Sequence, residues 1–418
     1  MNLLSKTNQN HDLIIYFQVH QPYRLRKFNF FDIGSDQPYF DEDLNSKILQ
    51  RIVLDCYLPT NKLLYKLIRK YPEIKVAFSV SGTTLDQFEK YAPEVLLSFR
   101  DLADTGSVEF LAETYYHSLA CILPGKEFEL QVVKHQESIY KHFGVRPNVF
   151  RNTELIYNDA VGRRIYNLGF RGVITDGIEK ILSGRSPHHI YAHPDFNDLR
   201  IALRNYRLSD DIAFRFAHGL TVDTYMSWLN AMPKEEQAVT LALDYETFGE
   251  HQKKQSGILT FLKDLLVRIV KERRYEMKTP SDIFRSETGS QLHVPEFISW
   301  ADEEKDLSAW LGNDMQRDAF ESLKKLEKKI HKIENPDLLH SWRQLQTSDH
   351  FYYMCTKRGE DKNVHDYFSP YASPYEAFIN YMNVLSDFNL KVQNEFKKLK
   401  RTLKKGGETQ PTFIRRNV

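Results

Sequence analysis

Two carboxylates stand where apolar, strand-like runs of the sequence end. Glu154 lies in the segment VFRNTELIYND, residues 149–159, and Asp244 lies in AVTLALDYE, residues 238–246. Burying an ionised carboxylate is expensive, so the group must be paired, neutralised or placed at a cavity where it reacts. Two facing carboxylates can divide into an ionised nucleophile and a protonated general acid. Cleavage of a glycosidic bond needs this division of roles.

The neighbours of the two carboxylates suit this chemistry. Arg151 and Asn152 stand beside Glu154 and could hold it in the ionised form. Glu246 follows Asp244 by two positions, and it could bind sugar or pair with Arg151. We expect the carboxyl groups of Glu154 and Asp244 to lie about 5–7 Å apart, since about 5–5.5 Å indicates a retaining mechanism and a wider gap an inverting one.

The elements that must position these groups alternate between strand and helix. Helix-period segments separate seven strand-like runs, at residues 13–20, 76–82, 108–115, 148–155, 172–177, 199–205 and 238–246. This alternation predicts parallel βαβ units. Seven strands are too few for a complete eight-stranded barrel, so we expect an incomplete seven-stranded (β/α) barrel over residues 1–300.

Polar residues follow several of these runs. They are His20 and Gln21 after the first run, Glu113 and His117 at the third, Glu154 at the fourth, Asp176 at the fifth, and Asp244 and Glu246 at the seventh. The carboxyl ends of barrel strands converge on the active site, so these side chains are predicted to meet there. The alternative is that they cap helices and form structural ion pairs.

The second half of the chain has a helical pattern. Apolar residues recur at three- and four-residue spacing, at Phe378, Met382, Leu385, Phe388, Val392 and Phe396. Such spacing indicates one buried helix face. We therefore expect a helical bundle over residues 301–405, packed on the barrel and completing its cleft. Residues 406–418 lack any period and are predicted to form a disordered tail.

Composition excludes several classes of protein. The net charge of +1 among 418 residues argues against nucleic acid and against a polybasic membrane surface. The N-terminus lacks the apolar core of a secretory signal, and no apolar run reaches the length of a membrane span, so we expect a soluble cytoplasmic protein. Cys56, Cys121 and Cys355 lie far apart and suggest neither disulfides nor a thiolate zinc site. The 13% aromatic content suits a carbohydrate-binding cleft or a large aromatic core.

Five ordered segments resemble the motifs of glycoside hydrolase family 57, and the resemblance runs from near residue 12 to at least residue 355. The segments are HQPY (20–23), GSVEFLAETYYHSLA (106–120), FRNTELIYN (150–158), LDYETFGEH (243–251) and DLSAWLGNDMQRDAF (306–320). The resemblance implies a seven-stranded barrel followed by a helical bundle, retention of anomeric configuration, and no metal or organic cofactor. It places the nucleophile at Glu154 and the general acid/base at Asp244. The sequences of these motifs are most similar to those of the α-amylase-like group, which implies hydrolysis of α-1,4-glucans.

The remaining candidates are expected to bind substrate. They are His20, Gln21, His117, Arg151, Glu246 and Trp310. For Trp310 we expect an exposed ring that stacks on a sugar and contributes little to core packing; the alternative is a core tryptophan. Asp349 and His350 resemble a family segment near the cleft, but a buried pair that braces the bundle would explain them equally well.

Other functions stay open at this point. The same fold serves 4-α-glucanotransferases and branching enzymes, in which a sugar accepts the glycosyl group. His20, His117, Asp176 and Asp244 could ligate a metal in a polysaccharide deacetylase, although no close pair of metal ligands stands at a strand end. A glucan-binding protein without turnover is the third alternative. The sequence does not give the oligomeric state.

Overall fold

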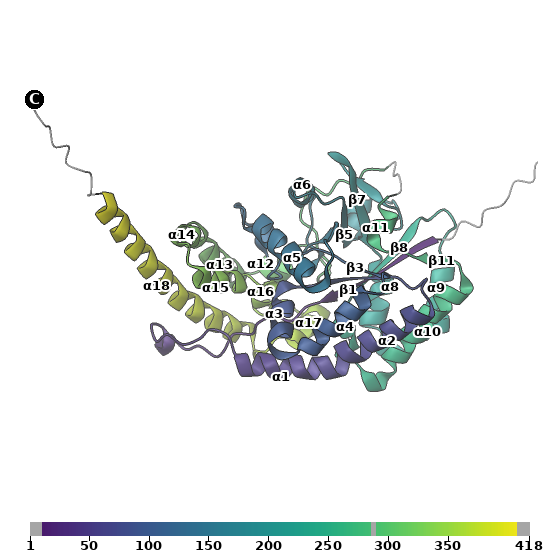
Figure 1. Cartoon of the computed structure of the whole chain (residues 1–418), viewed down its shortest axis with the longest axis horizontal. Coiled ribbons are helices and arrows are strands. Elements are labelled where there is room, and N and C mark those ends of the chain that lie inside the picture. Colours follow the sequence, from purple (N-terminus) through teal and green to yellow (C-terminus); the bar gives the residue numbers. More distant parts are fainter. Residues whose placement is uncertain (1–10, 286–289, 408–418) are drawn as a thin grey trace, which may run out of the picture. The chain divides into compact units, whose positions relative to one another are not determined.

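The computed structural model of the protein describes residues 11–285 and 290–407 (Figure 1). The chain divides into two compact units. The first extends to Tyr23 and continues over Glu42–Ala309, and the second contains Arg24–Asp41 and the chain from Trp310 onward. Sequence analysis assigned the segment Arg24–Asp41 to the barrel, whereas its contacts group it with the helical unit.

The first unit is built on seven parallel strands. They are β1 (His11–Val19), β2 (Val76–Val80), β3 (Val108–Phe110), β4 (Val149–Arg151), β5 (Gly172–Asp176), β7 (Phe196–Arg204) and β8 (Ala238–Asp244). Their order in the sheet is β3-β2-β1-β8-β7-β5-β4. A single parallel bridge between Ala112 and Phe150 joins the two outer strands, so the sheet curls round on itself. The predicted seven-stranded, incomplete barrel is confirmed.

The barrel is irregular in two places. β7 and β8 share one register pair, Arg204 with Thr240, and the β3–β4 side is held by the bridge just described. Short strands extend the sheet: β6 (Tyr191–His193) pairs antiparallel with β7, and β11 (Tyr275–Met277) pairs parallel with β1. The two weak pairings account for the barrel's departure from a regular cylinder.

Helices follow most of the strands, and several of them pack on the outer face of the sheet. They are α1 (Glu42–Ile52), α2 (Leu58–Lys70), α3 (Gly82–Tyr91), α4 (Pro93–Ala103), α5 (Glu127–Phe143), α6 (Asp159–Asn167), α7 (Glu179–Leu182), α8 (Tyr206–Ala213), α9 (Val222–Asn230), α10 (Ile258–Glu272) and α11 (Pro280–Ile283). A π-helical turn, Val53–Tyr57, connects α1 to α2. Pro93 is the first residue of α4, where its missing N–H leaves no helix hydrogen bond unmade.

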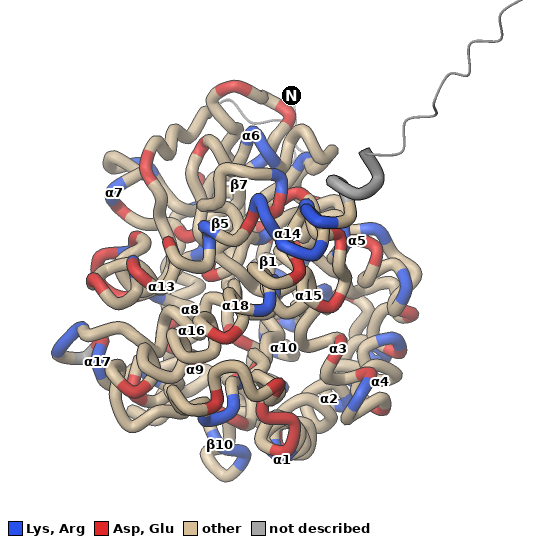
Figure 2. Tube along the Cα trace, turned by 90° about the vertical axis from the view of Figure 1, so that its left-hand side faces the viewer, with Lys and Arg blue, Asp and Glu red and all other residues tan. Residues whose placement is uncertain are grey.

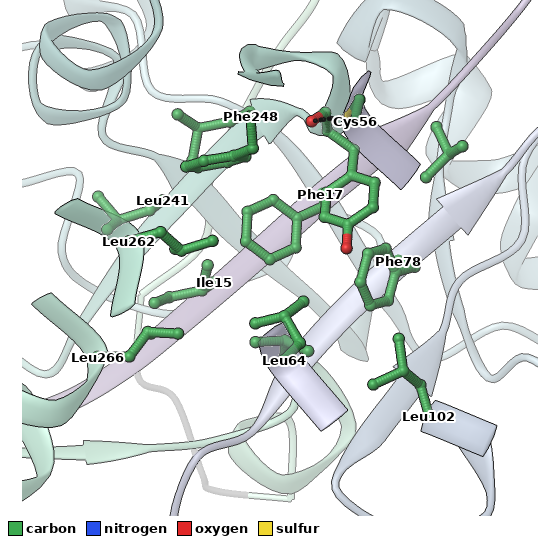
Figure 3. Close-up of a cluster of buried hydrophobic side chains, with 14 of the residues drawn as sticks. Ile15, Phe17, Cys56, Leu64, Phe78, Leu102, Leu241, Phe248, Leu262 and Leu266 are labelled. Atoms are coloured by element: carbon green, nitrogen blue, oxygen red, sulfur yellow. Dashed lines mark hydrogen bonds between the residues drawn. The ribbon is translucent and has the colours of Figure 1, made fainter. Parts of the chain in front are cut away.

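Both faces of the strands are buried, which explains their nearly continuous apolar sequences. Along β1, Ile15 and Phe17 point to the outer cluster, where Phe17 lies among Phe78 and Phe248 (Figure 3). Ile14 and Tyr16 belong to a separate cluster that includes Leu111, Ile174 and Ala202. This alternation follows from the two-residue period of a strand.

The second unit is helical. Its helices are α13 (Asp314–Lys324), α14 (Glu327–Ile333), α15 (Pro336–Gln344), α16 (Ser348–Tyr352), α17 (Glu360–Phe368) and α18 (Pro374–Gly407), and the short α12 (Ser308–Leu311) stands at the boundary. Polar residues of α18 hold the segment 24–41: Asn380 Oδ1 accepts a hydrogen bond from Phe28 N (2.7 Å), and Asp387 Oδ1 accepts one from Gly34 N (2.6 Å).

The apolar face predicted for α18 is confirmed only in part. Leu385, Phe388 and Val392 are buried, but Phe378, Met382 and Phe396 are only partly covered. The buried stripe includes Tyr381 and Val384 instead. The helix extends to Gly407, so the predicted tail cannot begin at residue 406, and residues 408–418 lie outside the described part of the chain.

Basic and acidic residues are mixed along the chain. Figure 2 shows basic and acidic residues interspersed along the trace, as the net charge of +1 implies. Among the described residues, no helix combines the length and the apolarity that crossing a membrane requires.

Candidate active site

Glu154 lies in a strained turn directly after β4. The turn Thr153–Leu155 places Glu154 at φ 57° and ψ 23°, in the left-handed region, and Leu155 follows at φ 52°. His117, whose side chain contacts Glu154, is also left-handed, at φ 49°. Residues other than glycine adopt this conformation at a cost, and such strain concentrates where function requires a particular geometry.

A buried chain of charges runs from Glu113 through His117 to Glu154. His117 Nδ1 lies 2.8 Å from Glu113 Oε2, and His117 Nε2 lies 2.9 Å from Glu154 Oε1. Burial alone would lower the pKa of His117, but hydrogen bonds to the two carboxylates raise it to about 9. Burial likewise opposes ionisation of Glu113, yet His117 lowers the pKa of Glu113 to about 2. Near neutral pH the ring is therefore a cation between two anions, and it donates a hydrogen bond to each.

Arg151 strengthens the positive field around these carboxylates. Its side chain is fully buried at the end of β4, with Nη1 3.8 Å from Glu113 Oε2. Among the described residues its guanidinium nitrogens make no hydrogen bond within normal distance, so its charge acts on its neighbours over a longer range. The carboxylate that Arg151 approaches is Glu113, whose pKa it helps to lower, and its predicted effect on Glu154 remains a prediction.

Asp244 is the last residue of β8 and lies opposite Gln18 of β1 in the sheet register. Burial of its carboxyl group and the nearby charge of Glu154 raise the pKa of Asp244 to about 7, against the opposing effect of Arg151. The residue remains half-buried, so its carboxyl group is not sealed off. Asp244 can thus carry a proton near neutral pH.

For Glu246 the sequence left two possibilities open, sugar binding or a pair with Arg151, and in the described part of the chain its hydrogen bonds go to other groups. Its Oε1 accepts hydrogen bonds from the backbone N–H of His20 (3.1 Å) and from the hydroxyl of Tyr57. Burial and the charge of Asp244 raise the pKa of Glu246 to about 8. The π-helical turn Val53–Tyr57 supplies the Tyr57 hydroxyl, and π-turns often mark functional sites.

His20 contacts the residues of the site, whereas Gln21 is buried in the packing around them. The His20 ring stacks on the His117 ring with 3.9 Å between centroids, and its Nδ1 lies 2.7 Å from Ser81 Oγ. The backbone N–H of Gln21 donates to Thr84 Oγ1 (2.7 Å), and the Gln21 residue is only 5% exposed. The structure therefore brings Glu154, Asp244, His117, Arg151, His20 and Glu246 together, and it places Gln21 in the surrounding packing.

Trp300 was not predicted as a site residue, and Glu113 was assigned no role there. The indole Nε1–H of Trp300 donates to Glu154 Oε2 (2.8 Å). Trp300 stands in an aperiodic stretch, VPEFISWADEE, that contains no strand or helix, so no local pattern pointed to it. Glu113 stood at a predicted strand end, and its pairing with a histidine four residues later was the available signal.

The proposed metal-ligand set of a deacetylase does not assemble. Both ring nitrogens of His117 face carboxylates, and Asp176 Oδ1 lies 3.4 Å from Arg204 Nη1 in a buried ion pair. Asp176 is thus held by an arginine of β7, and Asp244 lies within the field of Glu154. This arrangement suits carboxylate chemistry better than a set of metal ligands.

A curled (β/α) barrel that brings two carboxylates together at its strand ends fits a glycoside hydrolase of the barrel type. The comparisons with known proteins agree. The family model "Glycosyl hydrolase family 57" matches residues 14–300. The chain belongs to glycosyl hydrolase family 57, as its five sequence motifs suggested.

Relatives extend the similarity over most of the chain. A protein of Methanocaldococcus jannaschii named "Putative alpha-amylase" is 40% identical over 94% of this chain and 88% of its own length. A branching enzyme from Thermococcus kodakaraensis has a TM-score of 0.67 at 13% identity, covering 93% of this chain and 94% of that one. An alpha-amylase from Thermotoga maritima has a TM-score of 0.64 at 12% identity, covering 93% and 96%. The two structural likenesses show the fold alone.

Trp310 differs from the expectation of an exposed ring. Its side chain is fully buried and belongs to the helical unit, where its ring centroid lies 6.2 Å from that of Tyr352. His350 of the same unit is also buried, with its ring 5.7 Å from that of Tyr381, which agrees with the bracing role. Trp310 and His350 therefore pack in the interior of the helical unit.

Trp310→Ala is therefore expected to destabilise the protein, because truncating a buried tryptophan leaves a cavity that costs about 3–5 kcal/mol. Thermal and denaturant unfolding measure this loss. A substitution of the half-exposed Trp228, Trp228→Ala, is the matched control and should change the melting temperature far less. Equal melting temperatures for Trp310→Ala and the unaltered protein would contradict the core position of Trp310 and favour a contact with substrate.

Proposed function

We propose that the protein cleaves α-1,4-glucans as a retaining, α-amylase-like glycosidase. The observation that carries the proposal is the contrast between the surroundings of the two carboxylates. Glu154 accepts hydrogen bonds from a cationic histidine and from an indole N–H, whereas the pKa of Asp244 is raised to about 7. Hydrogen bonds to a carboxylate favour its charged form, so the nucleophile and the acid are distinguished before substrate binds.

In the first step an oxygen of Glu154 attacks the anomeric carbon of the bound sugar. The bond from that carbon to the glycosidic oxygen breaks, and Asp244 gives its proton to the departing oxygen. The sugar is then held as an ester of Glu154, and Asp244 is ionised. The loss of charge at Glu154 lets Asp244 ionise more readily, because that charge is one cause of its raised pKa.

In the second step Asp244 acts as a base. It takes a proton from the incoming acceptor, whose oxygen attacks the anomeric carbon from the opposite side and releases the Glu154 carboxylate. Two displacements at one carbon retain its configuration. His20 is proposed to orient the sugar, with Glu246 supporting His20 through its backbone. The buried Arg151 is proposed to stabilise the charges from behind.

Transfer to a sugar acceptor is the second candidate function, since the fold also resembles that of a branching enzyme. Chromatography of products from amylose, glycogen and short maltooligosaccharides separates the two. Shorter products alone support hydrolysis, longer products indicate transfer, and new branch points indicate a branching enzyme. A cytoplasmic location for this reaction remains a prediction from the sequence.

Substitution of each carboxylate should give a distinct result. Glu154→Gln removes the nucleophile's charge at nearly constant shape, so activity should fall by at least about 10³-fold. Asp244→Asn should be comparably impaired on natural glucans, but far less on an activated aryl glycoside whose leaving group needs little protonation. The measurement is the initial rate on both substrates, with folding checked by circular dichroism.

Azide provides the control for these roles. It should restore activity with inverted product to Glu154→Ala, because it replaces the nucleophile, and with retained product to Asp244→Ala, because it attacks the glycosyl ester. The opposite stereochemistry would exchange the two roles. Near-normal turnover by Glu154→Gln would make this glutamate structural and remove the basis of the proposal.

The pH profile should reflect the protonation of Asp244. The first step needs the protonated form, and the group loses its proton as pH rises through its pKa of about 7. Because the loss of one proton from Asp244 removes the acid, we expect kcat/KM to fall about tenfold for each pH unit well above pH 7. The fall should be absent for Asp244→Asn acting on the activated aryl glycoside. An unchanged kcat/KM from pH 6 to pH 9 would contradict the assignment of Asp244 as the acid.

A further inference from the structure

A stretch of chain with no regular secondary structure runs antiparallel to the loop that carries Glu154. We call residues 292–300 the strap and residues 154–159 the nucleophile loop. Backbone hydrogen bonds join the two along their length: Asp159 N to Val294 O (2.8 Å), Tyr157 N to Ile298 O (3.0 Å), Ile298 N to Tyr157 O (2.9 Å) and Trp300 N to Glu154 O (3.3 Å). The strap therefore binds the loop at its two ends and in its middle, although the loop belongs to no sheet.

The far end of the strap is anchored by a buried carboxylate. Asp159 Oδ1 accepts a hydrogen bond from the backbone N–H of Val294 (3.0 Å), and Asp159 Oδ2 lies 2.5 Å from His293 Nδ1. Leu292 is fully buried, and its N–H donates to the carbonyl of Ala192 in β6 (2.9 Å). These contacts fix where the strap begins relative to the barrel.

The near end of the strap reaches the reacting group. The Trp300 indole donates to Glu154 Oε2 (2.8 Å), while the Trp300 carbonyl accepts a hydrogen bond from Lys305 Nζ (2.6 Å). The guanidinium groups of Arg151 and Arg204 lie 5.2 Å and 5.4 Å from the centre of the indole ring. Attraction between these cations and the ring restricts the rotation of the indole, so its N–H stays directed at Glu154.

The strap solves a problem that the nucleophile loop cannot solve alone. Glu154 and Leu155 are both held in the left-handed conformation, which is unfavourable for any residue other than glycine. Hydrogen bonds along the strap and loop compensate for this cost. The two oxygens of Glu154 then face different donors, since His117 contacts Oε1 and Trp300 contacts Oε2.

We propose that the strap is the element that positions the nucleophile, and that Trp300 is a positioning residue whose N–H fixes Glu154 Oε2 and favours the ionised carboxylate. This inference rests on the proposed function, because it takes Glu154 to be the nucleophile. The strap lies outside the strands and helices of the barrel, and this proposal gives it a role.

Trp300→Phe tests the role of the indole N–H. The substitution keeps an aromatic ring near the two arginines and removes the donor. We expect kcat/KM to fall by about 10- to 100-fold, the effect of losing one hydrogen bond to a charged group. Protonation of Glu154 removes the nucleophile's charge, so activity should also fall at low pH, and this acid limb of the profile reports on Glu154. In the variant the acid limb should move to higher pH, because the ionised form of Glu154 has lost a donor.

The charged groups that face Glu154 are unchanged in this variant. They are His117 after β3, Asp244 at the end of β8, and Arg151 beside them on β4. The alkaline limb, assigned to Asp244, should therefore stay in place. A purely structural loss would lower activity without moving the acid limb, and that result would overturn the role given to Trp300.

Trp342→Phe is the matched control. Trp342 is a buried tryptophan of the helical unit whose indole donates to the carbonyl of Leu323 (3.1 Å). Its loss removes one indole hydrogen bond elsewhere in the chain, so stability should drop while both limbs of the pH profile keep their positions. A shift of the acid limb in Trp342→Phe would show that the shift does not report on Glu154.

Asp159→Ala tests the strap from its other end and serves if Trp300→Phe fails to fold. It removes the anchor of Val294 and His293 and leaves Trp300 and Glu154 unaltered. We expect kcat to fall and the acid limb to move in the same direction as in Trp300→Phe, with KM little changed. A normal pH profile for Asp159→Ala would contradict the claim that the strap positions Glu154. Near-normal turnover by Glu154→Gln would instead contradict the proposed function itself.

Discussion

The rest of the site depends on one buried arrangement, the imidazolium of His117 held between Glu113 and Glu154. Removing three charged groups from water is costly unless each finds a close partner, and here the hydrogen bonds of 2.8 Å and 2.9 Å supply the partners. The arrangement requires β3 and β4 to meet, because Glu113 and His117 follow β3 and Glu154 follows β4. The Ala112–Phe150 bridge brings these strand ends together, and a hydrogen bond between the Thr114 and Thr153 hydroxyls (2.6 Å) joins the residues that follow.

The same constraint separates the roles of the two carboxylates. Glu154 gains donors from both sides, whereas Asp244 gains the repulsion of Glu154 and a partly buried position at the end of β8. Arg151 limits this effect, since its charge lowers the pKa of Asp244. The balance leaves Asp244 able to give and take a proton near neutral pH, as a retaining mechanism demands of its acid/base group.

The sequence predicted the elements that follow a local period, and it missed contacts made by segments without one. All seven strands, and the polar residues at their ends, could be recognised from apolar runs that stop at His20, Glu154 and Asp244. Trp300 could not, because its approach to Glu154 depends on an aperiodic segment pairing with a distant loop. Trp310 was misjudged because a motif shows that a tryptophan is present but not whether its ring is covered. The helix face of α18 was predicted in the right region but rotated toward Tyr381 and Val384.

The protonation state of His117 tests this account most directly. Nitrogen NMR of the protein labelled with ¹⁵N-histidine, with His117→Gln to assign the signals, distinguishes an imidazolium from a neutral ring. We predict that both ring nitrogens of His117 carry protons at pH 7 and that the ring titrates near its pKa of about 9. A neutral His117 ring at pH 7, titrating at or below the ordinary histidine value of 6.5, would contradict the claim that a buried cation keeps Glu154 ionised.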